Sequence, residues 1–95
     1  MMLSPAMEMN AKDHRQYTLE LKAMRYIYHL AIYDANHVLL DSIIQFTRGG
    51  DLEAFLASDQ YGNLEVVVLM SLDSNNTAYD SFNFNGYQLA RNRDY

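Results

Sequence analysis

The sequence predicts an α+β protein with one five- or six-stranded antiparallel sheet built from hairpins, a short N-terminal helix and a short helix near residues 51–58. Three observations predict this fold class. Turn-forming residues at 34–37 separate two runs of branched and aromatic residues, residues 64–72 form a strongly apolar run, and Asn85-Gly86 is a strong hairpin signal. With 49% hydrophobic and 20% charged residues, the 95-residue chain fits one domain that spans its whole length.

The N-terminal segment is the first expected element. Ser4-Pro5 is typical of a helix start, because serine caps the first turn and proline lacks only an N–H that has no partner there. The pattern predicts a helix over about 5–14, with a mobile arm over 1–14 as the alternative. The segment lacks the features of a secretory signal, and no apolar run reaches the roughly 18 residues needed to cross a bilayer. We therefore expect a cytoplasmic protein, of a cell or a virus-infected host, with no membrane partner.

The next expected element is a hairpin of residues 25–33 and 38–47, with Tyr33 opposite Val38. One face of this hairpin carries Ile27, His29, Ala31, Tyr33, Val38, Leu40, Ser42, Ile44 and Phe46. The other face carries Tyr26, Tyr28, Leu30, Ile32, Leu39, Asp41 and Ile43. Because both faces are apolar, a helix, a second sheet or another chain must cover each of them.

The second of these faces predicts a homodimer that packs sheet against sheet. The expected interface consists of Tyr26, Tyr28, Leu30, Ile32, Leu39 and Ile43. A rival interpretation is one long helix over about 16–46, since apolar residues there also recur near helical spacing. We favour the hairpin.

Three elements are expected in the second half of the chain. Asp51 precedes strong helix formers, which favours a helix over 51–57, with a strand as the runner-up. The run at 64–72 predicts a central strand that is buried on both faces. At the C-terminal hairpin we expect three cross-strand pairs, namely Phe84 with Tyr87, Phe82 with Leu89, and Asp80 with Arg91.

The net charge of −5 lies entirely in the second half, because residues 1–48 balance to zero and no lysine or arginine occurs between Arg48 and Arg91. Such a field repels phosphate backbones, so we expect no direct nucleic-acid binding and a protein partner with a basic surface. The predicted partner-binding residues are Asp51, Glu53, Asp59, Glu65 and Asp73. The alternative is that these carboxylates only keep a small sheet protein soluble.

Motifs for catalysis or metal binding are weak. The chain has no cysteine, Gly-rich phosphate loop or nucleophile elbow. In the predicted hairpin, His29 and Asp41 lie on opposite faces, while Asp34 and His37 lie in the turn, so these possible ligands do not converge. We expect no catalytic residue, no cofactor and no metal site.

The expected function is that of a small acidic, non-catalytic protein-binding module, an inhibitor or adaptor that occludes a basic surface of a larger partner. Eight tyrosines support an interface role, since tyrosine is enriched at protein interfaces. Small acidic sheet proteins of this size recur among inhibitors and immunity proteins, including those that phages use against host defences. This analogy rests on size and charge alone, and no sequence motif supports it. The alternatives are a small ligand-binding α+β barrel or enzyme with a pocket of tyrosines and carboxylates, and an accessory subunit of a larger assembly.

Overall fold

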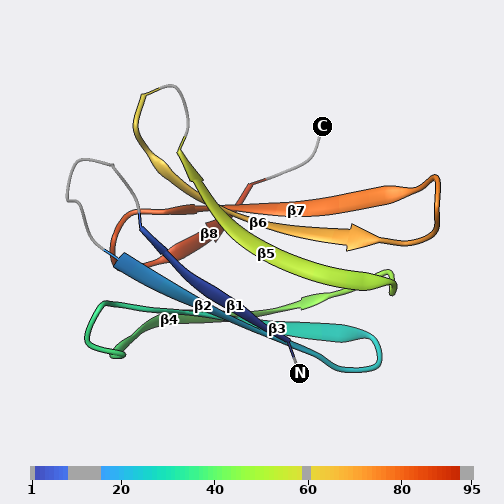
Figure 1. Ribbon diagram of the computed structural model, residues 1–95, viewed down its shortest axis with the longest axis horizontal. Helices are drawn as coiled ribbons and strands as arrows, with labels where there is room; N and C mark the ends of the chain where they lie inside the picture. The colour runs from blue at the N-terminus through green and yellow to red at the C-terminus, as the bar shows by residue number, and fades with distance from the viewer. Residues whose placement is uncertain (1, 9–15, 59–60, 93–95) are drawn as a thin grey trace.

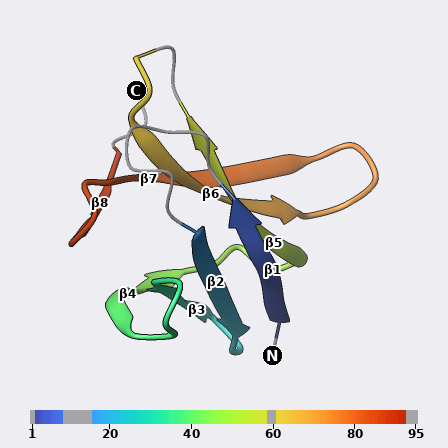
Figure 2. The same ribbon diagram turned by 60° about the vertical axis from the view of Figure 1, so that its left-hand side comes forward.

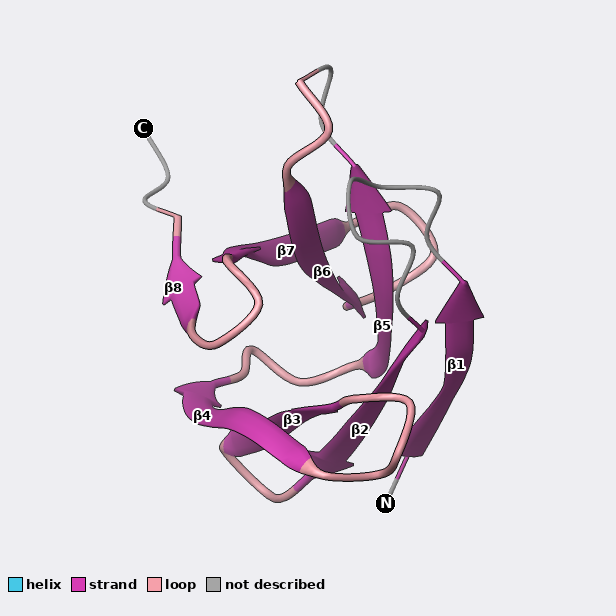
Figure 3. Cartoon of the chain, turned by 90° about the vertical axis from the view of Figure 1, so that its left-hand side faces the viewer, coloured by secondary structure: helices cyan, strands magenta, loops and turns pink. Residues whose placement is uncertain are grey.

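The computed structural model describes residues 2–8, 16–58 and 61–92, and all regular secondary structure in these ranges is β (Figures 1 and 3). The strands are β1 (Met2–Glu8), β2 (Gln16–Ala23), β3 (Ile27–Tyr33), β4 (Leu39–Phe46), β5 (Asp51–Ser58), β6 (Leu64–Ser71), β7 (Thr77–Phe84) and β8 (Leu89–Arg91). They form two antiparallel sheets, sheet A in the order β1-β2-β3-β4 and sheet B in the order β5-β6-β7-β8. The described ranges contain no helix, and so none long and apolar enough to span a membrane.

The two sheets pack face to face around one hydrophobic core (Figure 2). Strand β5 contacts β1 and β2, and β4 contacts β8 at the opposite edge. The largest fully buried side chains are Tyr17, Leu19 and Leu21 of β2, Tyr28, Leu30 and Ile32 of β3, Val66 and Val68 of β6, and Phe82 of β7. Because buried side chains recur at every second position of β2, β5 and β6, each of these three strands presents one face to the core and the other outward.

The predicted α+β class is wrong, because the chain is all-β in the described ranges and has two four-stranded sheets in place of one larger sheet. Residues 5–8 of the expected N-terminal helix belong to β1, which pairs with β2, and residues 9–14 lie outside the described part of the chain. The pairing is irregular between Leu3 and Ala6, where Pro5 stands. An edge strand tolerates proline at such an irregularity, so Ser4-Pro5 marks a break in a strand rather than a helix cap.

The expected helix near 51–58 is also wrong, since these residues form β5 and pair with β6 from Asp51 opposite Ser71 to Ser58 opposite Leu64. Leu52, Ala54 and Leu56 are buried, which is a period of two and not of 3.6. Helix propensities differ by less than about 0.7 kcal/mol per ordinary residue, whereas each large apolar side chain buried here contributes about 1.5–3 kcal/mol. Tertiary burial therefore decides the conformation of this segment.

The hairpin of β3 and β4 is confirmed, and the rival long helix over 16–46 is wrong. Its register differs by two residues from the predicted one, with Ile27 opposite Phe46, so the predicted faces are kept from Asp41 to Phe46. An irregularity between Ile32 and Tyr33 places Leu39 opposite Tyr33, and Leu40 packs against the core in its place, which corrects the predicted faces next to the turn. The turn is wider than expected because the Asp34 carboxylate accepts hydrogen bonds from the backbone N–H groups of Asn36 and Val38, at 2.8 and 3.0 Å. His37 completes this turn with a φ of 61°.

Strand β6 is central in sheet B, between β5 and β7, as the apolar run predicted. The expected burial on both faces is wrong, because every second residue from Leu64 to Met70 is buried and the residues between them are only half-buried. The C-terminal hairpin also forms, but with Phe84 opposite Leu89 and Phe82 opposite Arg91. The Asn85 side chain accepts hydrogen bonds from the backbone N–H groups of Tyr87 and Gln88, both at 2.8 Å. This cap widens the turn and moves the register by two residues.

Candidate functional site

Three of the five predicted partner-binding carboxylates share the outer face of sheet B. Asp51 and Glu53 alternate with buried residues on β5, and Glu65 does the same on β6. Half-buried apolar side chains lie between them, with Phe55 opposite Val67 and Glu53 opposite Leu69. We call this surface the acidic face and define it by Asp51, Glu53, Phe55, Glu65, Val67 and Leu69. No described lysine or arginine belongs to the outward positions of sheet B.

The remaining two predicted carboxylates have different positions. Asp73 lies in the β6–β7 turn, at the end of the sheet where Ser71 pairs with Asp51. Its carboxylate accepts hydrogen bonds from the Asn76 side chain at 2.7 Å and from the Asn75 backbone N–H at 2.8 Å, and these bonds lower the pKa of Asp73. Asp73 therefore caps its own turn, while Asp59 lies outside the described residues.

The predicted dimer interface needs correction. Tyr28, Leu30 and Ile32 have no exposed surface because sheet B covers them in the same chain, and half-buried Ile43 packs against this core. Tyr26 and Leu39 are exposed at opposite ends of the β3–β4 hairpin. These six residues do not form one accessible surface, so a dimer, which stays a prediction, requires other residues.

A polar cluster of Tyr28, Asp80 and Arg91 joins the two sheets. Tyr28 of sheet A donates a hydrogen bond to Oδ2 of Asp80 in β7, while the Arg91 guanidinium of β8 lies 3.0 Å from Oδ1 of the same carboxylate. Burial, and then the bond to Asp80, raises the pKa of Tyr28 far above its ordinary value, so the phenol stays protonated. Both oxygens of Asp80 are engaged, which suits a structural contact better than general acid–base catalysis.

A cavity of about 230 Å³ adjoins this cluster, between the end of β4 and the first half of β7. We call it the arginine cavity, since Arg48 and Arg91 line it together with Phe46, Tyr79 and Asp80. This site could not be found from the sequence, because its lining residues come from four separate segments, namely 45–48, Met70, 78–80 and Arg91. Arg48 and Arg91, the two cations that bound the acid-only window of the sequence, were the one available signal.

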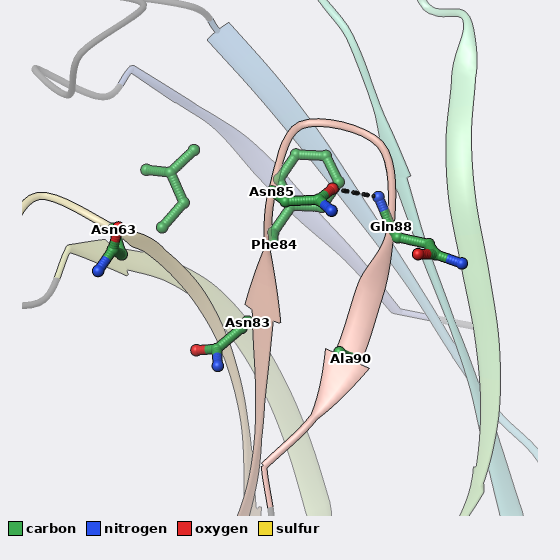
Figure 4. Close-up of a pocket in the computed structure, with 7 residues that line it drawn as sticks. Asn63, Asn83, Phe84, Asn85, Gln88 and Ala90 are labelled. Atoms are coloured by element: carbon green, nitrogen blue, oxygen red, sulfur yellow. Dashed lines mark hydrogen bonds between the residues drawn. The ribbon is translucent and has the colours of Figure 1, made fainter.

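A second cavity, of about 320 Å³, lies beside the β7–β8 turn (Figure 4). Amide side chains of Asn63, Asn83, Asn85 and Gln88 surround it, and none of the described residues that line it is charged. The Asn85 amide already caps the turn, as its bond to the Gln88 backbone shows. The described lining therefore offers neutral hydrogen-bonding groups.

Among the described residues, no three histidine, aspartate or glutamate side chains lie close enough together to hold a metal ion. His29 lies on the outer face of β3, and His37 lies in the β3–β4 turn. The Asp41 carboxylate of β4 accepts a hydrogen bond from the backbone N–H of Leu89 at 2.7 Å, a contact that ties the two sheet edges together.

No protein-family model, curated protein or solved structure matches this chain.

Proposed function

We propose that this chain is a small non-catalytic binding module that covers a basic surface of a larger protein with its acidic face. One observation carries the proposal: Asp51, Glu53 and Glu65 lie around half-buried apolar side chains on one outward sheet surface that has no described cation. Such a surface combines an apolar centre with carboxylates that attract a positively charged partner.

The size of the chain is compatible with this role. A standard interface buries about 800 Å² on each partner, which is roughly an eighth of the 6456 Å² surface of the chain. The acidic face also stands on regular strands, so little conformational entropy is lost when it binds.

The experiment compares the proteins captured from a lysate of the native host by the wild type, by Glu53→Gln and by Glu20→Gln. Glu20→Gln is a matched control, because this substitution removes the same charge from an outward position on β2 in the other sheet. We expect a partner with a basic surface that Glu53→Gln retains less well than the wild type, while Glu20→Gln retains it fully.

The purified partner then provides the quantitative test. The double variant Glu53→Gln with Glu65→Gln should bind this partner more weakly than the wild type does. Added salt should reduce the affinity of the wild type by a larger factor than the affinity of the double variant. Equal binding by the wild type, the double variant and Glu20→Gln would exclude the acidic face as the contact surface.

A further inference from the structure

Strand β4 is an edge strand of sheet A that lacks the usual protection against pairing with a further strand. Among the described strands, β4 pairs with β3 alone and ends the sheet (Figure 3). Natural proteins protect such an edge with a proline, a charged side chain, a bulge or a very short strand. Residues 42–46 of β4 contain no proline and no charge, and their pairing with β3 is regular. This part of β4 can therefore accept another strand.

The other three edge strands each carry such a protection. Strand β1 contains Pro5 at an irregularity of its pairing, and β5 has the outward carboxylates of Asp51 and Glu53. Strand β8 has only three residues. The edge of this chain that best fits β4 is therefore β4 of a second copy. Two identical edges give a closed, two-fold symmetric pair rather than an open chain of molecules.

The hairpin register shows which backbone groups of β4 point to the free edge. Thr47 donates its N–H to the carbonyl oxygen of Tyr26 at 2.9 Å. Because bonding alternates along an antiparallel ladder, the odd-numbered residues of this segment bond to β3, whereas Ile44 and Phe46 turn their N–H and C=O groups outward. The N–H of Ser42 points the same way, and it donates to the carboxylate of the preceding residue at 2.8 Å. Ile44 and Phe46 therefore offer the groups that a second strand would bind.

The side chains at this edge are apolar, and the charges at its two ends are opposite. Phe46 is 83% exposed, more than any other large apolar side chain of the described residues, and Ile44 is 61% exposed. An exposed apolar edge of this kind is typical of a strand that pairs with another chain. Asp41 lies near one end of β4 and Arg48 follows the other end. An antiparallel arrangement of two copies brings these opposite charges together twice.

We propose that two copies of this chain form a dimer by antiparallel pairing of their β4 strands, with Ile44 opposite the partner subunit's Phe46. This register joins the outward backbone groups of both residues in two hydrogen-bonded pairs. It also sets a branched side chain beside an aromatic ring, which is a favourable cross-strand pair. Gln45 then lies opposite the partner subunit's Gln45 at the two-fold axis. The acidic face belongs to the other sheet, so the proposal does not depend on the proposed function.

Sedimentation equilibrium of the full chain across the micromolar range tests this dimer. We expect a reversible change from 11.0 kDa to twice that mass, with no larger species. Phe46→Lys should raise the dissociation constant about tenfold or more, because a lysine on an edge strand opposes pairing and the apolar contact is lost. Tyr79→Lys is the matched control, since it places the same charge at an exposed aromatic position of β7 in the other sheet.

The control variant should change the dissociation constant less than about twofold, as exposed substitutions away from a contact usually do. Both substituted side chains are exposed, and far-UV circular dichroism verifies that both variants keep the fold. A monomer at every concentration, association beyond the dimer, or equal dissociation constants for the two variants would overturn the proposal.

Disulfide cross-linking tests the register directly. The chain has no cysteine, so a single introduced cysteine can only link one copy to another. The two Gln45 residues form a non-hydrogen-bonded pair with Cα atoms about 4.5 Å apart, which is within the range that a disulfide spans. Gln45→Cys should therefore give a linked dimer on mild oxidation. Ser42→Cys, at a more exposed position on the same strand, lies far from its own copy in this register and should not. No linked Gln45→Cys dimer, or equal linking of both variants, would also overturn the proposal.

Discussion

Asp80 makes one of the polar contacts that join the two sheets. It receives one hydrogen bond from Tyr28 across the core and one from Arg91 along its own sheet. A buried carboxylate is tolerated only when its oxygens find such donors. The sequence predicted Asp80 opposite Arg91; the ion pair forms although Arg91 lies opposite Phe82, and it joins a buried carboxylate to a guanidinium that is partly exposed.

The first prediction concerns the hydroxyl group of Tyr28. Tyr28→Phe keeps the ring and removes the donor, so one buried oxygen of Asp80 loses its partner. The free energy of unfolding should fall by about 1–3 kcal/mol. Urea denaturation measures the loss, and Tyr26→Phe, which alters an exposed tyrosine two residues away, is the control. Equal midpoints for the two variants would show that the bond to Asp80 contributes nothing.

The second prediction concerns stability at high pH. The folded state keeps the proton of Tyr28 above the ordinary pKa of 10.0, whereas the unfolded state releases it. The contribution of Tyr28 is therefore fully present below about pH 10 and is lost as the pH rises further, by up to about 1.4 kcal/mol per pH unit. Urea midpoints at pH 8, 10 and 11 should fall less steeply for Tyr28→Phe. Parallel pH profiles for the variant and the wild type would contradict the raised pKa.

At the scale of the elements, the short connection between β4 and β5 joins the two sheets through Gly49 and Gly50. Both have a left-handed backbone, with φ values of 95° and 80°. A side chain on Gly50 would meet the carbonyl oxygen of Ser71 at 2.2 Å, whereas a side chain on Gly49 would meet nothing within 4 Å. Only the second glycine is therefore required by packing as well as by its backbone angle.

The third prediction uses this pair of glycines. Gly49→Ala should cost about 1–2 kcal/mol through backbone strain alone. Gly50→Ala should cost on the order of 1–3 kcal/mol more, since the end of β6 must move to admit the methyl group. Thermal unfolding of the two variants isolates the clash, because the strain is common to both. A smaller loss for Gly50→Ala would contradict the close approach to Ser71.

The sequence predicted elements where local chemistry determines them. Asp34 and Asn85 marked two turns, yet their side chains also cap these turns and widen them, which moved both registers by two residues. The prediction of a helix at 51–58 was wrong, because pairing with β6 outweighs the helix propensity of these residues. That pairing depends on the tertiary fold and cannot be seen in the local sequence. The acidic face was partly predicted from charge alone, whereas Arg48 and Asp80 meet at one cavity only after both sheets have formed.

On the scale of the whole molecule, the charges are segregated. Glu53 and Glu65 lie on the acidic face, whereas Arg48 and Arg91 line a cavity between β4 and β7. A partner that approaches the acidic face experiences a field of one sign, which acts mainly on the rate of association. Apolar contacts of Phe55 and its neighbours act mainly on the rate of dissociation.

The fourth prediction follows from this separation. Raising the ionic strength from 0.1 M to 1 M shortens the screening length from about 10 to about 3 Å, so association with a basic partner should slow while dissociation changes much less. Glu53→Gln with Glu65→Gln should reproduce part of this effect at low salt. Stopped-flow mixing with the captured partner measures both rates. An association rate that responds to neither change would leave the carboxylates the role of keeping the protein soluble.

Each sheet consists of strands that follow one another in the sequence, which has a consequence for the order of folding. Neighbouring hairpins can close within each half of the chain, whereas Tyr28 and Asp80 lie 52 residues apart and meet only when the halves dock. Because closing a long loop is slower than closing short ones, docking should follow the transition state for folding. Tyr28→Phe should therefore accelerate unfolding and leave the refolding rate nearly unchanged. Refolding that slows as much as unfolding accelerates would place the docking of the halves before the transition state.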